Sequence, residues 1–156
     1  MVRVAPVGTE VSIYSELADL PPFNPDLDTE AAPAAVIRFR AALQACDAVL
    51  ISSPEYAHGV PGVLKNALDW VVGSGEFIDK PVAVVNASAR ATHAWTSLVE
   101  TLTIMSARVI RGASITVPLD GGRLDANGIA HDARLAALLM SALDALVQAT
   151  PNARAV

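Results

Sequence analysis

The stretch from Ser53 to Trp70, SPEYAHGVPGVLKNALDW, constrains the fold of this chain more than any other part of the sequence. An apolar, strand-like run precedes it, and Pro and Gly residues punctuate it before a helical pattern begins. Pro61 suits the first turn of a helix, because its missing N–H would have no partner there. The pattern therefore predicts a stiff loop between a strand and a helix. Open α/β sheets bind their ligands at such loops, at the carboxyl ends of the strands.

The helix expected after this loop spans residues 61–72 and stops at Gly73. Lys65 and Asp69 lie four residues apart on its polar face, a spacing that favours an ion pair. The opposite face is apolar and consists of Val63, Leu64, Ala67, Leu68, Val71 and Val72. This division predicts a helix that packs one face on a core.

Apolar strands alternate with amphipathic helices along the rest of the chain, which predicts a parallel α/β sheet. The expected strands are Glu10 to Tyr14, Asp47 to Ser52, Lys80 to Asn86 and one within Val109 to Val117. One expected helix begins at Pro33 and has a face of Val36, Phe39 and Leu43. Another carries a stripe of Trp95, Leu98, Leu102 and Met105, and the last spans His131 to Gln148. A Gly-rich irregular segment, Leu119 to Ile129, precedes the last helix. We expect residues 1–156 to form one domain, because no repeat or linker interrupts the pattern.

Composition narrows the function classes. The chain is 53% hydrophobic and has a net charge of −5 with no basic stretch, which argues against nucleic acid as a partner. No apolar run reaches the roughly 18 residues of a membrane span, and the start lacks a signal-peptide pattern, so we expect a cytoplasmic protein with no membrane contact. Cys46 is the only cysteine, which makes an intrachain disulfide impossible. It is either core filling or a redox thiol, and core filling is the more common case.

The run SPEYAHGVPGVLKNALDW resembles the second flavin loop and the following helix of the NADPH-dependent FMN reductases, a family with a flavodoxin-like fold. The usual form in that family is close to PEYN, two small residues and PGxLKNALDW. The upstream run ELADLPPFNPDLD and the tail from Leu124 to Leu146 also fit the family. The resemblance implies a three-layer α/β/α parallel sheet. It also implies FMN as the cofactor and NADPH or NADH as the hydride donor.

The start of the chain departs from the family pattern. Members begin with a strand, a Gly/Ser-rich loop resembling GSLRxxS and a helix, whose N–H groups hold the FMN phosphate. These elements need about 25 residues, whereas only Met1 to Thr9 precede the expected strand at Glu10. Val2 to Gly8 resembles the tail of that first helix. We therefore expect the first strand to be missing by truncation of a longer product, or the sheet to be repaired by direct pairing or by a strand from another chain.

By resemblance, the flavin ring lies against a loop made of Pro54, Glu55, Tyr56, Ala57, His58 and Gly59. Backbone atoms of this loop contact the ring, and Tyr56 and the residues after it wall its edge. Ala57 stands where the family usually has Asn, so a polar side-chain contact is lost. His58 is either an exposed loop residue without a role or a ring that lies over the flavin or near a bound quinone. Glu55 and Tyr56 either contact the ring, shape the turn or touch a partner subunit.

The loop after the strand at residues 80–86 is the second expected contact. The family usually has S-x-G followed by paired glycines, whereas this chain reads NASARATH from Asn86 to His93. Ser88 and its N–H are expected at the edge of the flavin ring, although the glycines that permit close approach are gone. Arg90 either attracts the phosphates of NADPH or is solvated. His93 is either a local hydrogen-bonding residue or a ligand.

The resemblance implies a flavin-dependent NAD(P)H oxidoreductase that reduces quinones, free flavin or similar small acceptors. In this family the protein orients and tunes the cofactor and supplies no acid or base of note, so we assign no catalytic residue. The sequence contains no metal-ligand spacing and no Ser/His/Asp pattern. Without a phosphate loop, we expect this chain to bind FMN weakly or not at all. The alternatives are a flavin-incompetent or truncated relative that acts as a binding or structural module and, more weakly supported, a flavodoxin-like electron carrier.

The resemblance also implies a homodimer or tetramer, because relatives dimerise through the region of the helix at residues 61–72. Trp70 falls with Asn66 on the polar side of that helix, and an aromatic side chain on a solvent-directed face commonly marks an interface. We expect the interface to bury Trp70 or the loop at Tyr56. Burial of Trp70 under a neighbouring loop of the same chain is the alternative.

Overall fold

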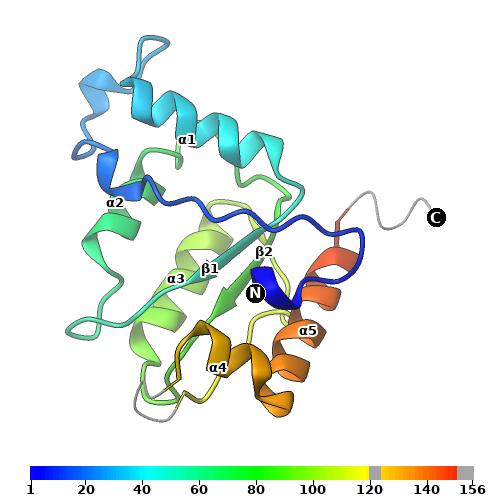
Figure 1. Ribbon diagram of the computed structural model, residues 1–156. Coiled ribbons are helices and arrows are strands. Elements are labelled where there is room, and N and C mark those ends of the chain that lie inside the picture. The colour runs from blue at the N-terminus through cyan, green and yellow to red at the C-terminus, as the bar shows by residue number, and fades with distance from the viewer. Residues whose placement is uncertain (120–123, 151–156) are drawn as a thin grey trace.

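In the part of the chain that the structure describes, three parallel strands lie at the centre of the molecule (Figure 1). The computed structural model describes residues 1–119 and 124–150 of the chain. The strands are hydrogen-bonded in the order of their numbers: β1 (Val49–Ser52), β2 (Pro81–Val85) and β3 (Arg108–Val109). The expected strands at Asp47 to Ser52 and Lys80 to Asn86 are therefore confirmed, one or two residues shorter at their ends.

The pairing register keeps the carboxyl ends of β1 and β2 level with each other. Val49 lies opposite Val82, and Ser52 lies opposite Val85. β3 is only two residues long, and a parallel bridge between Asn86 and Thr116 extends the contact beyond it. The strand expected within Val109 to Val117 is thus divided, because the chain turns away from the sheet after β3 and returns at Thr116.

Alternate side chains of β2 point into two separate cores, as the period of two in a strand requires. Val82 and Val84 lie in the larger core, with apolar side chains of α1, α2 and α3. Ala83 and Val85 lie on the opposite face, in clusters that contain side chains of α5. The helices are α1 (Ala34–Ala45), α2 (Gly62–Asp69), α3 (His93–Ile104), α4 (Ala126–His131) and α5 (Ala133–Gln148). The α/β class and the three layers are those expected.

The helix at Pro33 is confirmed, with Val36, Phe39 and Leu43 buried as predicted. The segment before the last helix differs from expectation, because Ala126–His131 forms the short helix α4. The side chain of Asp125 accepts a hydrogen bond from Gly128 N at 2.7 Å and so caps this helix. A capped helical turn replaces part of the irregular segment expected at Leu119 to Ile129. Residues 120–123 of that segment lie outside the described residues.

The strand expected at Glu10 to Tyr14 does not form, and this prediction is wrong. The segment has no strand assignment and no ladder partner in the part of the chain that the structure describes. In the flavodoxin-like order 2-1-3-4-5, a second strand pairs with the first and not with the third. A strand needs partners for its backbone N–H and C=O groups. β1 therefore forms one border of the described sheet, and its Val49, Leu50 and Ile51 are only half-buried, whereas all of β2 is buried.

Trp70 lies in the core and not on an exposed polar face, which corrects its assignment to an interface. Its side chain is 0% exposed, and its indole N–H donates to the carbonyl of Pro21 at 2.8 Å. Phe23 packs edge-on against the indole, with ring centroids 5.1 Å apart. The proline-rich segment covers this side of α2, so burial under a neighbouring loop is the alternative that holds. On the exposed face, Lys65 and Asp69 form the expected ion pair at 2.5 Å.

Asn66 fastens the same proline-rich segment to α2. Its side-chain oxygen accepts a hydrogen bond from Phe23 N at 2.8 Å, and its amide donates to Pro21 O at 3.0 Å. We predict that Asn66→Ala lowers the free energy of unfolding by about 2 kcal/mol, because Phe23 N loses its acceptor and the carbonyl of Pro21 keeps only the Trp70 indole as a donor. Lys65→Ala on the same helix is the control, and we expect a loss below about 1 kcal/mol because that ion pair is exposed. Urea unfolding measures both. Equal losses in the two variants would contradict this account.

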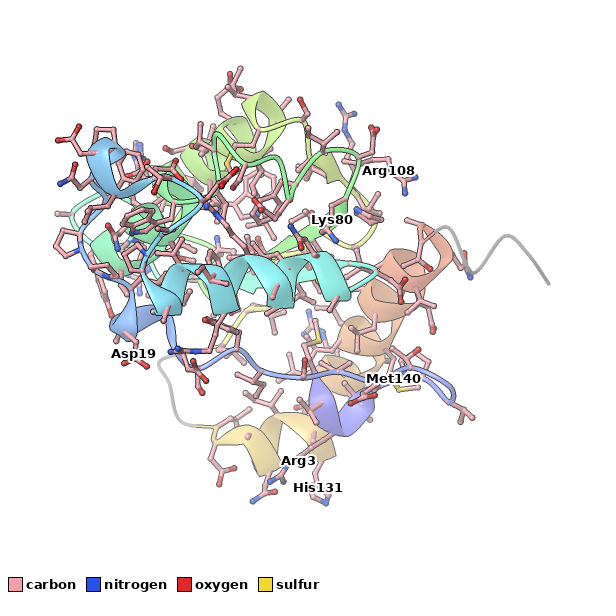
Figure 2. The ribbon with its side chains drawn as sticks, turned by 90° about the horizontal axis from the view of Figure 1, so that it is seen from above. Arg3, Asp19, Lys80, Arg108, His131 and Met140 are labelled. Carbon is pink, nitrogen blue, oxygen red and sulfur yellow. The ribbon has the colours of Figure 1, made fainter. Side chains whose placement is uncertain are left out.

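The side chains of Lys80 and Arg108 lie at the end of the sheet opposite the loop at Pro54. Lys80 Nζ donates to the carbonyl of Cys46 at the end of α1, and Arg108 donates to the carbonyl of Ala149 at the end of α5. Figure 2 shows these two side chains at the same end of the molecule. Cations stabilise helix carboxyl ends, so both helices are fixed at the amino ends of β2 and β3.

The thiol of Cys46 belongs to this end of α1 and donates to the carbonyl of Leu43 at 3.3 Å. Burial raises the pKa of the Cys46 thiol, and the nearby Lys80 ammonium opposes this effect. A thiol that keeps its proton is a poor nucleophile, which favours a packing role over a redox role. Within the described residues, none of the helices combines the length and the apolar character needed to cross a membrane.

Candidate functional site

The loop after β1 ends in a tight turn that carries most of the predicted site residues. Tyr56 and Gly59 exchange two backbone hydrogen bonds, at 3.1 and 2.8 Å. The two residues between them have positive φ angles, 48° at Ala57 and 62° at His58. A two-residue turn of this kind favours Asn or Gly, because a Cβ atom is strained in the left-handed region. The Asn that the family usually has at position 57 suits this conformation better than Ala57 does.

Glu55 connects this loop to α3. Its carboxylate accepts a hydrogen bond from the backbone N–H of Ala94 at 2.8 Å. Ala94 lies in the first turn of α3, where N–H groups have no partner within the helix and a negative charge is favoured. Glu55 therefore caps a helix that lies 39 residues further along the chain. Of the roles weighed for Glu55, the structure supports that of a residue that shapes the loop.

Asn86 organises the second loop, and the sequence reasoning did not single it out. Its side chain is 5% exposed, accepts from Ser88 N at 3.0 Å and donates to Ala91 O at 2.7 Å. Its backbone N–H donates to Ile115 O, which ties the loop to the segment beyond β3. The sequence did contain one indication of this role, because Asn86 is a polar residue directly after the fully apolar strand β2. The N–H of Ser88, expected at the ring edge, is engaged here by Asn86.

A cleft lies where these two loops meet the start of α3. Its polar wall comes from Ser53, Glu55 and Asn86. Its apolar wall consists of Val84, Val85, Ala91, Ala94, Trp95 and Leu98. The Trp95 indole is held in place by a hydrogen bond from its N–H to Val84 O at 3.4 Å. The cleft thus has an aromatic and aliphatic side with a few polar groups.

The structure distributes the predicted site residues unevenly around this cleft. Glu55 lines it directly, and Gly59 is half-buried at the base of the turn. Four residues of the turn and its approach are exposed, namely Pro54, Tyr56, Ala57 and His58. Ser88 is exposed as well, on the loop that Asn86 holds. The contacts of these residues with a flavin ring stay a prediction.

His58 and His93 stack on each other, which neither of the readings weighed for them anticipated. Their ring centroids are 4.2 Å apart, and their planes differ by 21°. One ring comes from the turn after β1 and the other from the first residue of α3. Among the described residues, no cluster of three or more His, Cys, Asp or Glu side chains is arranged to hold a metal ion. The stacked rings thus connect the turn after β1 to the start of α3.

The fold and the cleft together define a flavodoxin-like α/β protein that places a ligand site at the carboxyl ends of its parallel strands. The family model for NADPH-dependent FMN reductases matches residues 2–122. The chain belongs to this family.

Individual members of the family are similar to this chain in sequence, in structure or in both. An NAD(P)H-dependent FMN reductase of Pseudomonas aeruginosa is 31% identical over 150 residues, which cover 93% of this chain and 80% of the relative. A quinone reductase of Pseudomonas putida is 44% identical over 89 residues, which cover 55% of this chain and 47% of the relative. The chain thus spans about half the length of that relative. Among solved structures, the flavoenzyme NAD(P)H:(acceptor) oxidoreductase of Paracoccus denitrificans matches with a TM-score of 0.65 and 27% identity, over 86% of this chain and 79% of that one.

FMN and NAD(P)H are the cofactors of this family, and the described residues fit the flavin ring better than its phosphate. The cleft offers apolar surface and polar loop atoms, which are the two kinds of contact that a planar ring with hydrogen-bonding edges uses. A phosphate is usually held by free N–H groups at a helix N-terminus. Here the carboxylates of Glu55, Asp125 and Asp132 already cap α3, α4 and α5. α1 and α2 begin directly after Pro33 and Pro61 and have no side-chain cap, but neither helix start lines the cleft.

The strained turn gives a test of the loop geometry. We predict that Ala57→Gly raises the free energy of unfolding by about 1 kcal/mol, because glycine adopts a positive φ without the cost that a Cβ atom imposes. Ala89→Gly is a matched control in the second loop, where no positive φ occurs at that residue. It should destabilise slightly or have no effect, because it only adds chain entropy to the unfolded state. Thermal unfolding of both variants checks this. Destabilisation by Ala57→Gly would show that the turn has another conformation.

Proposed function

We propose that this protein is a flavin-dependent NAD(P)H oxidoreductase that reduces quinones, free flavin or similar small acceptors. The observation that carries the proposal is the cleft between the two loops, in a chain of the NADPH-dependent FMN reductase family. The names of the relatives in Pseudomonas aeruginosa and Pseudomonas putida support the same reaction class. The position of the cleft, at the carboxyl ends of β1 and β2, agrees with the general rule for ligand sites in open α/β sheets.

In this proposal the protein binds and orients, and a bound flavin supplies the hydride transfer between NAD(P)H and the acceptor. The turn from Pro54 to Gly59 and the loop at Ser88 face the edge of the ring. Trp95 and Leu98 provide an apolar wall that excludes water from one side of the cleft. Glu55 and Asn86 keep the two loops in fixed positions, so little ordering is left to occur on binding. No side chain is assigned the role of an acid or a base.

We further propose that the protein works as a cytoplasmic homodimer or tetramer. Trp70 no longer supports an interface, because it is buried within its own chain. The remaining candidate is the turn at Tyr56, whose side chain is 67% exposed although it is large and aromatic. Tyrosine is enriched at interfaces, where its apolar ring and its hydroxyl are both used.

A second candidate function is a binding or structural module that has lost flavin chemistry. The capped N-terminus of α3 favours it, because Glu55 already occupies the start of the helix that lines the cleft. We therefore expect FMN to bind this chain weakly, and a test of the reductase proposal needs FMN in excess. Absence of any flavin-dependent oxidation at saturating FMN would support the module and contradict the reductase.

Substitution of Glu55 tests the proposed function. The purified chain is mixed with excess FMN, NADPH or NADH and a benzoquinone, and oxidation of the nicotinamide is followed by absorbance. We predict that Glu55→Ala lowers kcat/KM by about tenfold or more, because the loop after β1 loses its hydrogen bond to α3 and the ring is less well oriented. Glu100→Ala removes a carboxylate from the exposed side of the same helix and should leave kcat/KM unchanged. Equal rates in the two variants would contradict the assigned role of Glu55.

A further inference from the structure

The stacked rings of His58 and His93, here called the histidine pair, lie beside the cleft. Their centroids are 4.2 Å apart, and their planes differ by 21°. His93 directly precedes Ala94, which lines the cleft and donates its N–H to the carboxylate of Glu55. His58 belongs to the turn that follows Glu55. The pair therefore lies next to the hydrogen bond between Glu55 and Ala94, where the turn after β1 meets the start of α3.

Both residues of the histidine pair are exposed, so their position does not result from packing in the core. Within the described part of the chain, neither imidazole makes a hydrogen bond or an ion pair. A stack of two rings also leaves the outer face of each ring uncovered by its partner. Aromatic rings attract one another beyond the effect of the area they bury. The pair thus presents a flat aromatic surface, open to a further ring, beside a ligand cleft.

The two histidines stand where the sequence departs from the usual form of the family. His58 takes the place of one of the two small residues that follow PEYN, and His93 ends the loop that lacks the paired glycines. These positions belong to different loops, yet their side chains meet. A small residue at either position would remove the stack. The flat surface is therefore a feature of this chain's own sequence, and the family resemblance does not imply it.

We propose that the histidine pair is a stacking surface for planar aromatic acceptors and makes this protein prefer fused two-ring quinones to single-ring quinones. The inference rests on the proposed function, since it names the acceptor class of the same site. A fused quinone covers more of an outer imidazole face than a single-ring quinone does, and the gain from stacking grows with the covered area. The pair binds the acceptor and takes no part in the transfer of a proton or a hydride.

Two substitutions separate the aromatic surface from the geometry of the turn. His58→Asn removes one ring at a position with a φ of 62°, a conformation that Asn adopts more readily than most residues do. His93→Phe keeps a flat ring in the stack. His131→Ala on α4 is the control, because Ile129 of α4 packs in the cluster on the opposite face of the sheet from α3. Figure 2 shows His131 on that far side.

The first test compares two acceptors that differ in the number of their rings. They are a naphthoquinone methylated at both free quinone carbons and duroquinone, in which every quinone carbon is likewise substituted and addition to the Cys46 thiol is blocked. With excess FMN and NADPH, we expect His58→Asn to raise the KM for the naphthoquinone about fivefold and that for duroquinone less than about twofold, with little change in kcat.

The KM for NADPH in His58→Asn should stay within about twofold of the native value, as should every constant of His93→Phe and His131→Ala. Equal changes for the two quinones, or no change for either, would overturn the inference. A larger change for NADPH than for the naphthoquinone would also overturn it, because the pair would then stack on the nicotinamide or the adenine ring.

A binding measurement on the flavin-free chain keeps this inference separate from the proposed function. The same naphthoquinone is titrated into the protein, and the imidazole C–H resonances are followed by NMR. We expect the resonances of His58 and His93 to move upfield until they saturate, because the stacked ligand adds its ring current, and those of His131 to stay in place. Shifts that do not exceed those of His131, or that do not saturate, would overturn the inference. If NADPH is not oxidised at saturating FMN, the proposed function fails, and this titration still decides whether the pair stacks on flat rings.

Discussion

The hydrogen-bonded position of β2 between β1 and β3 is the constraint on which the rest of this structure depends. Five consecutive buried residues leave no freedom for β2 to shift by one position, because such a slip would exchange the side chains of the two cores. The register with β1 then brings Ser52 and Val85 to the same level. Two loops that are far apart in sequence therefore leave the sheet side by side, and the cleft between them follows from the strand pairing.

Side-chain contacts then fix the positions of the two loops that the strand pairing brings together. Glu55 spans the cleft to reach α3, and Asn86 folds its own loop around one buried amide. These contacts hold the second loop, which lacks the glycines that the family resemblance leads one to expect there. The site of this chain is consequently built from fixed polar contacts between its loops. Such an arrangement reduces the entropy lost on binding and makes the ring site sensitive to changes in individual side chains.

Much of the fold could be predicted because the decisive signals are local. Apolar spacing located α1 with its buried Val36 and Phe39, and the continuous apolar run located β2. The strand expected at Glu10 to Tyr14 was wrong because local β propensity cannot supply a ladder partner. Trp70 was assigned to the surface because helical spacing describes one helix and ignores the proline-rich segment that covers it.

The candidate site was predicted less completely, for a related reason. The loop from Pro54 to Gly59 and Ser88 came from a resemblance carried by one sequence run. The contacts that shape the cleft join residues far apart in the chain, such as Glu55 with Ala94 and His58 with His93. No period within either segment indicates that these side chains meet. They follow only from the parallel order of β1 and β2, which brings the two loops to one edge.

The central claim is that this edge binds the ring of a flavin. Lumiflavin carries the ring without a phosphate or a sugar chain, so its binding depends on the ring site alone. Titration of lumiflavin into the labelled protein, followed by backbone amide chemical shifts, tests the claim most directly. The account predicts that the largest shifts fall in residues 54–59 and 86–95. Largest shifts on α4, α5 or the segment before α1, or no shifts at saturating lumiflavin, would contradict it.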